Sequence, residues 1–305
     1  MKIWKHSLTV GYNLSGQSFF DAIAPYKEYI AEFYFSFSHT MRNKPLDEKG
    51  TFLSLKEADQ HGIRGNLLIN SEQDEDRVDE LIDLARKCVD LKAVTLLDKR
   101  AAKQLKAEYP DLAIHMSTKC SKRMKLTEED AKYIDCVNLN EPFIHGRTQK
   151  QLIRDCKKYG VKTKFIANRG CICQADRMTS VMLGKKYKCC NSSCRKLNEE
   201  YPWIDLARVS YYKEMVPYWR PDILKLSTRD LPDDVIGYML ADWCQDSKTM
   251  FVGSIPISEA ARPVLQQWAK TRCTECDGRC NVCGKCKAYY EKIVEANKKD
   301  DGTIP

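Results

Sequence analysis

Residues 93–117 read AVTLLDKRAAKQLKAEYPDLAIHMS, and this stretch decides the fold of the chain. An apolar, β-branched run at Ala93–Asp98 is followed by the helix-periodic segment Lys99–Tyr109 and then by a second apolar run at Leu112–Ser117. This order is typical of a βα unit, in which consecutive strands lie parallel in one sheet.

The same alternation recurs along the chain and predicts eight strands. The apolar runs are Ser7–Tyr12, Ile30–Phe37, Gly65–Asn70, Ala93–Asp98, Leu112–Ser117, Ile134–Asn140, Thr163–Ala167 and Ile223–Ser227. Helical segments are expected at Asp76–Val89, Lys99–Tyr109, Thr127–Lys132 and Thr148–Tyr159, and two more near Ser258–Lys270 and from about Ala288. Eight βα units favour a closed (β/α)₈ TIM-like barrel over an open sheet. We expect a barrel domain at 1–256 with an insertion at 168–200, and a helical, cysteine-rich extension at 257–305.

Composition indicates a soluble, cytoplasmic protein. The chain has 305 residues, 43% of them hydrophobic, which suffices for one large core. The first residues, Met1–His6, have no apolar segment behind their charges, and no stretch has the 18 apolar residues of a membrane span, so no membrane partner is expected. The net charge of +8 is compatible with RNA, but diffuse lysines on solvated faces explain most of it.

Fifteen cysteines are unusual for a cytosolic chain and indicate metal binding rather than disulfides. The first group comprises Cys171, Cys173, Cys189, Cys190 and Cys194, in the long segment after the seventh predicted strand. Its all-thiolate composition favours an iron–sulfur cluster, with a four-cysteine zinc site as the alternative. Five scattered cysteines read as small core residues: Cys88, Cys120, Cys136, Cys156 and Cys244.

The second cysteine group has five members within fourteen residues near the end of the chain. They are Cys273, Cys276, Cys280, Cys283 and Cys286. Such dense spacing predicts a metal knuckle, although ferredoxin-type clusters and zinc knuckles use overlapping spacings. Cys276, Cys280 and Cys283 also match the spacing of radical S-adenosylmethionine enzymes, but those enzymes carry it after the first strand, and here it follows the eighth.

Four segments resemble the U32 family, the collagenase-like peptidases, several of which are iron–sulfur proteins of oxygen-independent hydroxylation. They are Ile114–Thr118 (IHMST), Val137–Glu141 (VNLNE), Lys164–Cys171 (KFIANRGC) and Asp222–Arg229 (DILKLSTR). The resemblance implies a 4Fe–4S cluster on Cys171 or Cys173 together with Cys190 and Cys194. The segment Gln174–Met178 and the terminal knuckle depart from the family's pattern. The sequence has no HExxH, no GxSxG and no evident Cys/His pair outside the cysteine groups, so proteolysis is not expected.

Polar residues at the predicted strand ends supply the candidate site, because the carboxyl ends of barrel strands form the active-site face. Proton transfer is assigned to Glu141 or His115 and the holding of an anionic group to Arg169. The full set is His39, His115, Glu141 and Arg169 as catalytic residues, with Arg42 and Asn140 as cofactor-binding residues. Helix capping by such polar residues, and a satisfied buried position for each histidine, are the structural alternatives.

These features predict an oxygen-sensitive iron–sulfur oxidoreductase acting on a small molecule, a peptide or RNA. It would carry one or two 4Fe–4S clusters, with zinc as the alternative metal of the terminal knuckle, and its reaction would be redox chemistry or oxygen or sulfur transfer. The alternative is a non-catalytic electron-transfer or scaffold subunit that works beside a protein partner or electron donor. A radical S-adenosylmethionine-like enzyme is the third reading.

Overall fold

The computed structural model describes most of the chain in several stretches. These are residues 5–13, 15–36, 48–69, 78–87, 91–121, 124–139, 147–167, 202–203, 206, 213–215, 218, 221–226, 228, 232–244, 251–252, 255–276 and 283–299. No helix in these stretches is long and apolar enough to cross a membrane.

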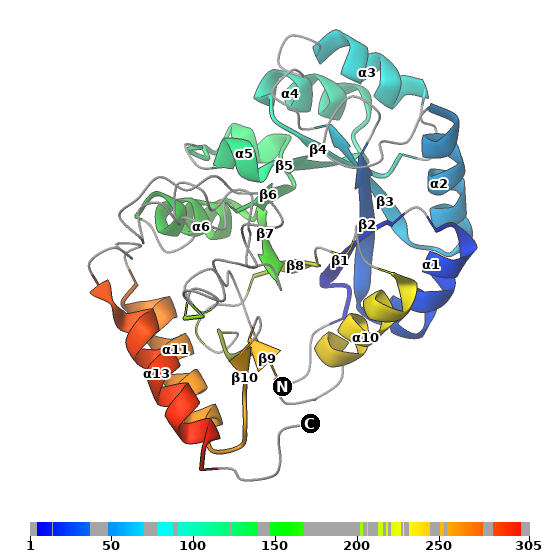
Figure 1. Cartoon of the computed structure of the whole chain (residues 1–305). Helices are drawn as coiled ribbons and strands as arrows, with labels where there is room; N and C mark the ends of the chain where they lie inside the picture. The colour runs from blue at the N-terminus through cyan, green and yellow to red at the C-terminus, as the bar shows by residue number, and fades with distance from the viewer. Residues whose placement is uncertain are drawn as a thin grey trace. The chain divides into compact units, whose positions relative to one another are not determined.

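Eight parallel strands close into a barrel, which confirms the predicted (β/α)₈ fold (Figure 1). The strands are β1 (Leu8–Gly11), β2 (Ile30–Ser36), β3 (Arg64–Ile69), β4 (Ala93–Leu96), β5 (Ala113–Met116), β6 (Cys136–Asn138), β7 (Lys162–Ala167) and β8 (Ile223–Leu226). Each one coincides with a predicted run to within two residues at both ends. The first and last strands pair in register, Leu8 with Leu224 and Val10 with Leu226.

The strands are apolar because both of their faces are covered. All four residues of β1 and of β4 are buried, as are the last five of β7. In a barrel one face of each strand meets the surrounding helices and the other meets the barrel interior, so a strictly alternating pattern is not required.

The helices between the strands agree in part with the sequence. They are α1 (Gln17–Ile23), α2 (Glu48–Gln60), α3 (Val78–Lys87), α4 (Lys99–Glu108), α5 (Thr118–Ser121), α6 (Arg147–Tyr159) and α10 (Asp233–Cys244), with 3₁₀ turns η1 (Ala24–Tyr29) and η3 (Asp130–Lys132). The sequence analysis missed α1, α2, α5 and α10. The helix predicted at Thr127–Lys132 was wrong, since only the turn η3 forms there.

Contacts of Asp130 explain why that segment stays a turn. Its backbone N–H donates to Thr127 Oγ1, and its carboxylate accepts from Thr127 N at 2.9 Å and from Lys99 Nζ at 2.6 Å. These bonds form a helix-capping pattern, but β6 starts at Cys136, too soon for a helix to extend.

The chain divides into two compact units. The first comprises residues 1–140, 148–165 and 221–246, and the second comprises 141–147, 166–220 and 247–305. The second contains η5 (Lys213–Met215), a ribbon of β9 (Phe251–Val252) and β10 (Ile255–Pro256), and the helices α11 (Arg262–Thr274) and α13 (Lys285–Asn297).

Helices α11 and α13 pack together within the second unit. Trp268 and Ile293 are buried, and the hydroxyls of Thr271 and Tyr289 lie 2.9 Å apart. The sequence analysis placed the end of the first helix near Lys270, which was wrong by one turn. Cys273 therefore lies on α11 rather than beyond it.

Candidate functional site

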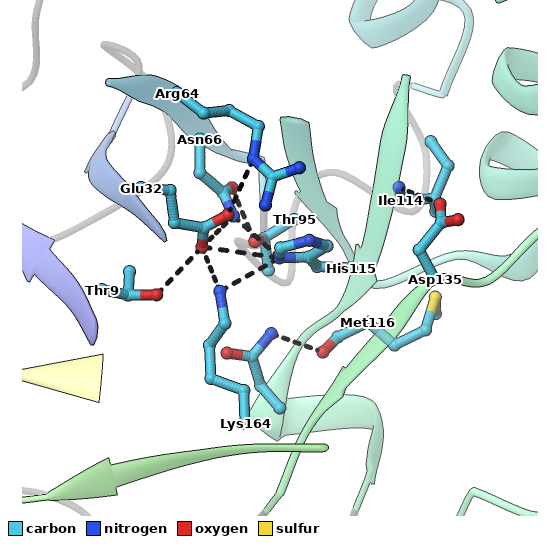
Figure 2. Close-up of polar contacts among 11 residues, drawn as sticks. Thr9, Glu32, Arg64, Asn66, Thr95, Ile114, His115, Met116, Asp135 and Lys164 are labelled. Carbon is cyan, nitrogen blue, oxygen red and sulfur yellow. Dashed lines mark hydrogen bonds and ion pairs between the residues drawn. The ribbon is translucent and has the colours of Figure 1, made fainter. Parts of the chain in front are cut away.

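A cluster of polar and charged side chains lies inside the barrel, on residues near the start or middle of their strands (Figure 2). Strand side chains alternate between the two faces, and these residues occupy inward positions. Each has a relative exposure of 3% or less: Thr9, Glu32, Asn66, Thr95, His115 and Lys164. The barrel interior is therefore not a purely apolar core.

Glu32 is the centre of this cluster. Its Oε1 accepts hydrogen bonds from Thr9 Oγ1 at 3.2 Å, from Asn66 Nδ2 at 2.9 Å and from the ammonium of Lys164. Its Oε2 has no hydrogen-bond partner among the described residues and lies 3.7 Å from Arg64 Nε. Burial alone would raise the pKa of Glu32, but the cation of Lys164 and that of Arg64 outweigh burial and hold the pKa well below its usual range. Glu32 is thus a buried carboxylate.

His115 is held neutral beside this ion pair. Its Nδ1 lies 2.9 Å from Asn66 Nδ2 and 3.1 Å from Lys164 Nζ. Both of these groups are donors, so Nδ1 accepts and the proton of the neutral ring is on Nε2. Burial, reinforced by the charge of Lys164, lowers the pKa of His115 to about 3.

The orientation of Asn66 follows from its third contact. Thr95 Oγ1 donates to Asn66 Oδ1 at 2.9 Å, which leaves the amide nitrogen to donate to Glu32 and His115. Because both the oxygen and the nitrogen of the Asn66 side-chain amide are hydrogen-bonded, only one arrangement of donors and acceptors fits the cluster. Such a connected network makes a barrel interior rigid, although Glu32 Oε2 has no hydrogen-bond partner among the described residues.

Of the six predicted catalytic and cofactor-binding residues, the structure describes His115 alone. His39, Arg42, Asn140, Glu141 and Arg169 lie outside the described residues. His115 occupies the satisfied buried position that was the structural alternative, and its role in proton transfer stays a prediction. Asp98 caps α4 by accepting from Arg100 N at 2.6 Å, as the capping alternative expects.

Four cysteines of the terminal knuckle are described. Cys273 is near the end of α11, Cys276 follows that helix, Cys283 precedes Gly284, and Cys286 is the second residue of α13. Gly284 has a φ of 59°, a left-handed conformation that glycine adopts without strain. The chain can therefore turn directly into α13 between the last two cysteines.

Cys286 lies in a partly ionic environment. Arg272, itself buried, donates from Nη1 to Cys286 Sγ at 3.9 Å. Burial raises the pKa of Cys286, the cation of Arg272 opposes this effect, and the neighbouring Cys276 and Cys283 add to it. Among the described residues, however, no three Cys, His, Asp or Glu side chains form a metal-binding group.

The remaining predicted ligands are Cys171, Cys173, Cys190, Cys194 and Cys280, and they lie outside the described residues. The core role of the scattered cysteines is confirmed for Cys136, Cys156 and Cys244, which are buried. Cys120 is half-buried and donates to Ser117 O at 3.0 Å, and Cys88 lies outside the described residues.

Sequence reasoning missed the centre of the cluster, Glu32 and Lys164. The sequence did contain a signal, since each is a charged residue within an apolar strand run. Charged residues are rarely buried in such runs unless they have a partner. The runs did not identify the partners, because 132 residues separate the two.

Comparison with known proteins adds little beyond the fold. No family model and no curated protein matches the chain. Solved structures similar to it include the U32 peptidase Mk0906, with 12% identity and a TM-score of 0.40 over 55% of this chain and 71% of that one. Citrate synthase SbnG has 7% identity and a TM-score of 0.38 over 65% and 92% of the two chains. The HpcH/HpaI aldolase from Desulfitobacterium hafniense DCB-2 has 11% identity and a TM-score of 0.36 over 64% and 91%. At these values the likenesses concern the barrel fold alone.

Proposed function

We propose that the protein is an iron–sulfur enzyme, in which the barrel binds the substrate and the cysteine groups hold one or two 4Fe–4S clusters. Its reaction would be a redox modification or an oxygen or sulfur transfer, such as an oxygen-independent hydroxylation. The observation that carries the proposal is the hairpin of α11 and α13, in which the buried Arg272 donates from Nη1 to Cys286 Sγ at 3.9 Å and Cys276 and Cys283 lie in the connection between the two helices.

Metal binding accounts for this hairpin better than a core role does. Thiols that merely fill a core are inert, as Cys136 and Cys156 illustrate, because burial raises the pKa of each to about 12. Cys286 differs from them in accepting a hydrogen bond from a buried guanidinium. Thiolates that share a site repel one another unless a metal neutralises them. A donor such as Arg272 is the kind of outer group that stabilises cluster sulfurs.

The barrel would supply the rigid part of the substrate site. The ion pair of Glu32 and Lys164 connects β2 to β7 inside the barrel, and Asn66 extends the contacts to β3 and β5. Residues at the carboxyl ends of the strands would then be held on a fixed base. When bound, a cluster with four thiolate ligands carries electrons, and one with three leaves an iron open to substrate.

A second candidate function is a non-catalytic electron-transfer or scaffold subunit. It is favoured by the position of the described knuckle cysteines, all of which belong to the helical hairpin rather than to barrel strands. The radical S-adenosylmethionine reading has less support, because Cys276 and Cys283 follow the eighth strand in the chain.

Metal analysis of anaerobically purified protein tests the proposal. Iron and acid-labile sulfide should be present in cluster proportions, with an EPR signal on reduction, and Cys286→Ala should lower the iron content. Cys156→Ala, which removes a buried thiol of α6, is the matched control and should leave the iron unchanged. Zinc without sulfide, or the absence of both metals, would refute the iron–sulfur proposal. Turnover of a substrate by the isolated chain would exclude the subunit alternative.

A further inference from the structure

We propose that Trp268 is a positioning residue of the metal site in the hairpin of α11 and α13, where its indole N–H donates to the sulfur of Cys286 once that sulfur is a metal-bound thiolate. The inference rests on the proposed function in one respect, which is that the hairpin holds a metal. It is the same for a cluster and for a single ion. It adds to the site a residue of α11 that sequence reasoning did not select.

The indole of Trp268 is buried and has an unused donor. Its side chain is 1% exposed, and Nε1 has no hydrogen-bond partner among the described residues. A buried indole N–H usually finds a partner, because an unsatisfied buried donor is costly. Such a donor in a native protein needs an explanation, and one explanation is an acceptor that becomes stronger when a ligand binds.

Helix geometry places this donor on the side of α11 that faces the cysteines of α13. Trp268 and Arg272 are four residues apart on α11 and therefore lie on the same side of it. Arg272 Nη1 donates to Cys286 Sγ at 3.9 Å, and the hydroxyls of Thr271 and Tyr289 lie 2.9 Å apart. Burial raises the pKa of the Cys286 thiol, and the charge of Arg272 and then the N–H of Trp268 oppose this effect. Both donors therefore act on the same sulfur.

The protonation state of Cys286 decides whether the indole can be used. A thiol sulfur is a weak acceptor, whereas a hydrogen bond to a charged sulfur is much stronger. A cysteine must lose its proton to bind a metal, and the negative sulfur could then accept from Trp268 as well as from Arg272. Groups that donate to the ligand atoms of a metal orient these ligands and increase the affinity.

The surroundings of Cys286 differ from those of the nearby Cys283. Cys283 is exposed and can be stabilised by water, whereas Cys286 is half-buried. A buried thiolate needs donors from the protein, because burial disfavours the charged form. The two donors of α11 meet this need at Cys286, and its position in the first turn of the 13-residue helix α13 also favours a negative sulfur.

Cobalt titration of the full-length apoprotein under anaerobic conditions tests the inference, since Co²⁺ bound by thiolates gives a charge-transfer absorption. Trp268→Phe keeps an aromatic ring in the core and removes the N–H. We expect this variant to bind Co²⁺ about 10- to 100-fold more weakly than wild type, the usual effect of losing a donor to a metal ligand. The matched control is Trp243→Phe, because Trp243 is also buried but belongs to α10 in the first unit, and it should keep the wild-type affinity.

A double-mutant cycle distinguishes donation to the sulfur from packing. In a Cys286→Ala background the acceptor is absent, so Trp268→Phe should cause no further loss of Co²⁺ affinity. A second measurement uses the unaltered indole. Bound Co²⁺ quenches nearby tryptophan fluorescence, so titration should reduce the emission of wild type and should reduce it less in Cys286→Ala.

Three results would overturn the inference. They are a wild type that binds no Co²⁺ through thiolates, a folded Trp268→Phe that binds Co²⁺ as tightly as wild type, and an equal effect of Trp268→Phe with and without Cys286. If Trp268 only packed the hairpin, Trp268→Phe would melt earlier without losing affinity. Iron and sulfide are measured separately on the purified protein, so zinc without sulfide would refute the iron–sulfur proposal and leave this inference standing.

Discussion

Replacing Lys164 by methionine should destabilise the barrel strongly, because it removes the main partner of a buried carboxylate. In the variant, Glu32 would keep Arg64 at 3.7 Å and two neutral donors, Thr9 and Asn66, but no cation in hydrogen-bonding contact. Removal of one partner of a buried ion pair typically costs about 3–5 kcal/mol. For a domain of this size, each kcal/mol shifts the melting temperature by about 2–4 °C, so we expect a decrease of about 6–20 °C.

The measurement is thermal unfolding followed by circular dichroism, with urea unfolding at one temperature as a second assay. Lys132→Met is the matched control, since Lys132 pairs with Glu129 at 2.6 Å but its side chain is 69% exposed. Solvent screens such a pair, so the control should melt with the wild type. Glu32→Leu combined with Lys164→Met should recover part of the loss, because neither charge is then left alone. If Lys164→Met melted like the control, Glu32 would not depend on Lys164, and the buried ion pair would not stabilise the barrel.

Two further changes test the electrostatics of each unit. The pKa of His115 falls from an ordinary 6.5 to about 3 in the folded barrel, so the unfolded chain binds one more proton between these values. As the pH falls below 6.5, the free energy of unfolding should therefore decrease by about 1.4 kcal/mol per pH unit. In urea unfolding experiments between about pH 6 and 4.5, His115→Asn should lose this dependence of the unfolding free energy on pH. An unchanged dependence would show that another group titrates. Arg272→Gln removes a cation 3.9 Å from the sulfur of Cys286 and should lower the reduction potential of a cluster bound there, whereas the exposed Lys270→Gln should not. Equal potentials in an EPR-monitored redox titration would argue against a metal at the hairpin.

The fold could be predicted from the sequence because barrel strands are buried on both faces. Runs such as Ala93–Leu96 and Ile223–Leu226 are short and apolar and recur between helical segments, and no distant contact is needed to recognise them. The helices were harder, because α1 has only seven residues and owes its place to aromatic packing. Phe19 and Phe20 contact Tyr12 and Phe33, and these contacts form only once β1 and β2 are assembled.

The polar interior could not be predicted in the same way. A charged residue within an apolar run suggests a buried partner but does not identify it, since Glu32 and Lys164 meet only when the barrel closes. The search for polar residues at the ends of predicted strands also selected His115 as a proton-transfer residue. In the structure, Nδ1 of its ring accepts from two donors. The pattern directed attention to the carboxyl ends of the strands, whereas the polar cluster lies nearer their starts and middles, where the strand register brings its members together.

The charged level of the barrel interior contributes to stability rather than to binding. Lys164 is at the level of Glu32, where its ammonium, the amide of Asn66 and the imidazole of His115 contact the carboxylate or one another, so a ligand there would have to displace an internal bond. A buried charge is costly to separate from its partner. A substrate of the barrel would therefore meet the residues nearer the carboxyl ends of the strands, and the level of Glu32 would hold those residues in place.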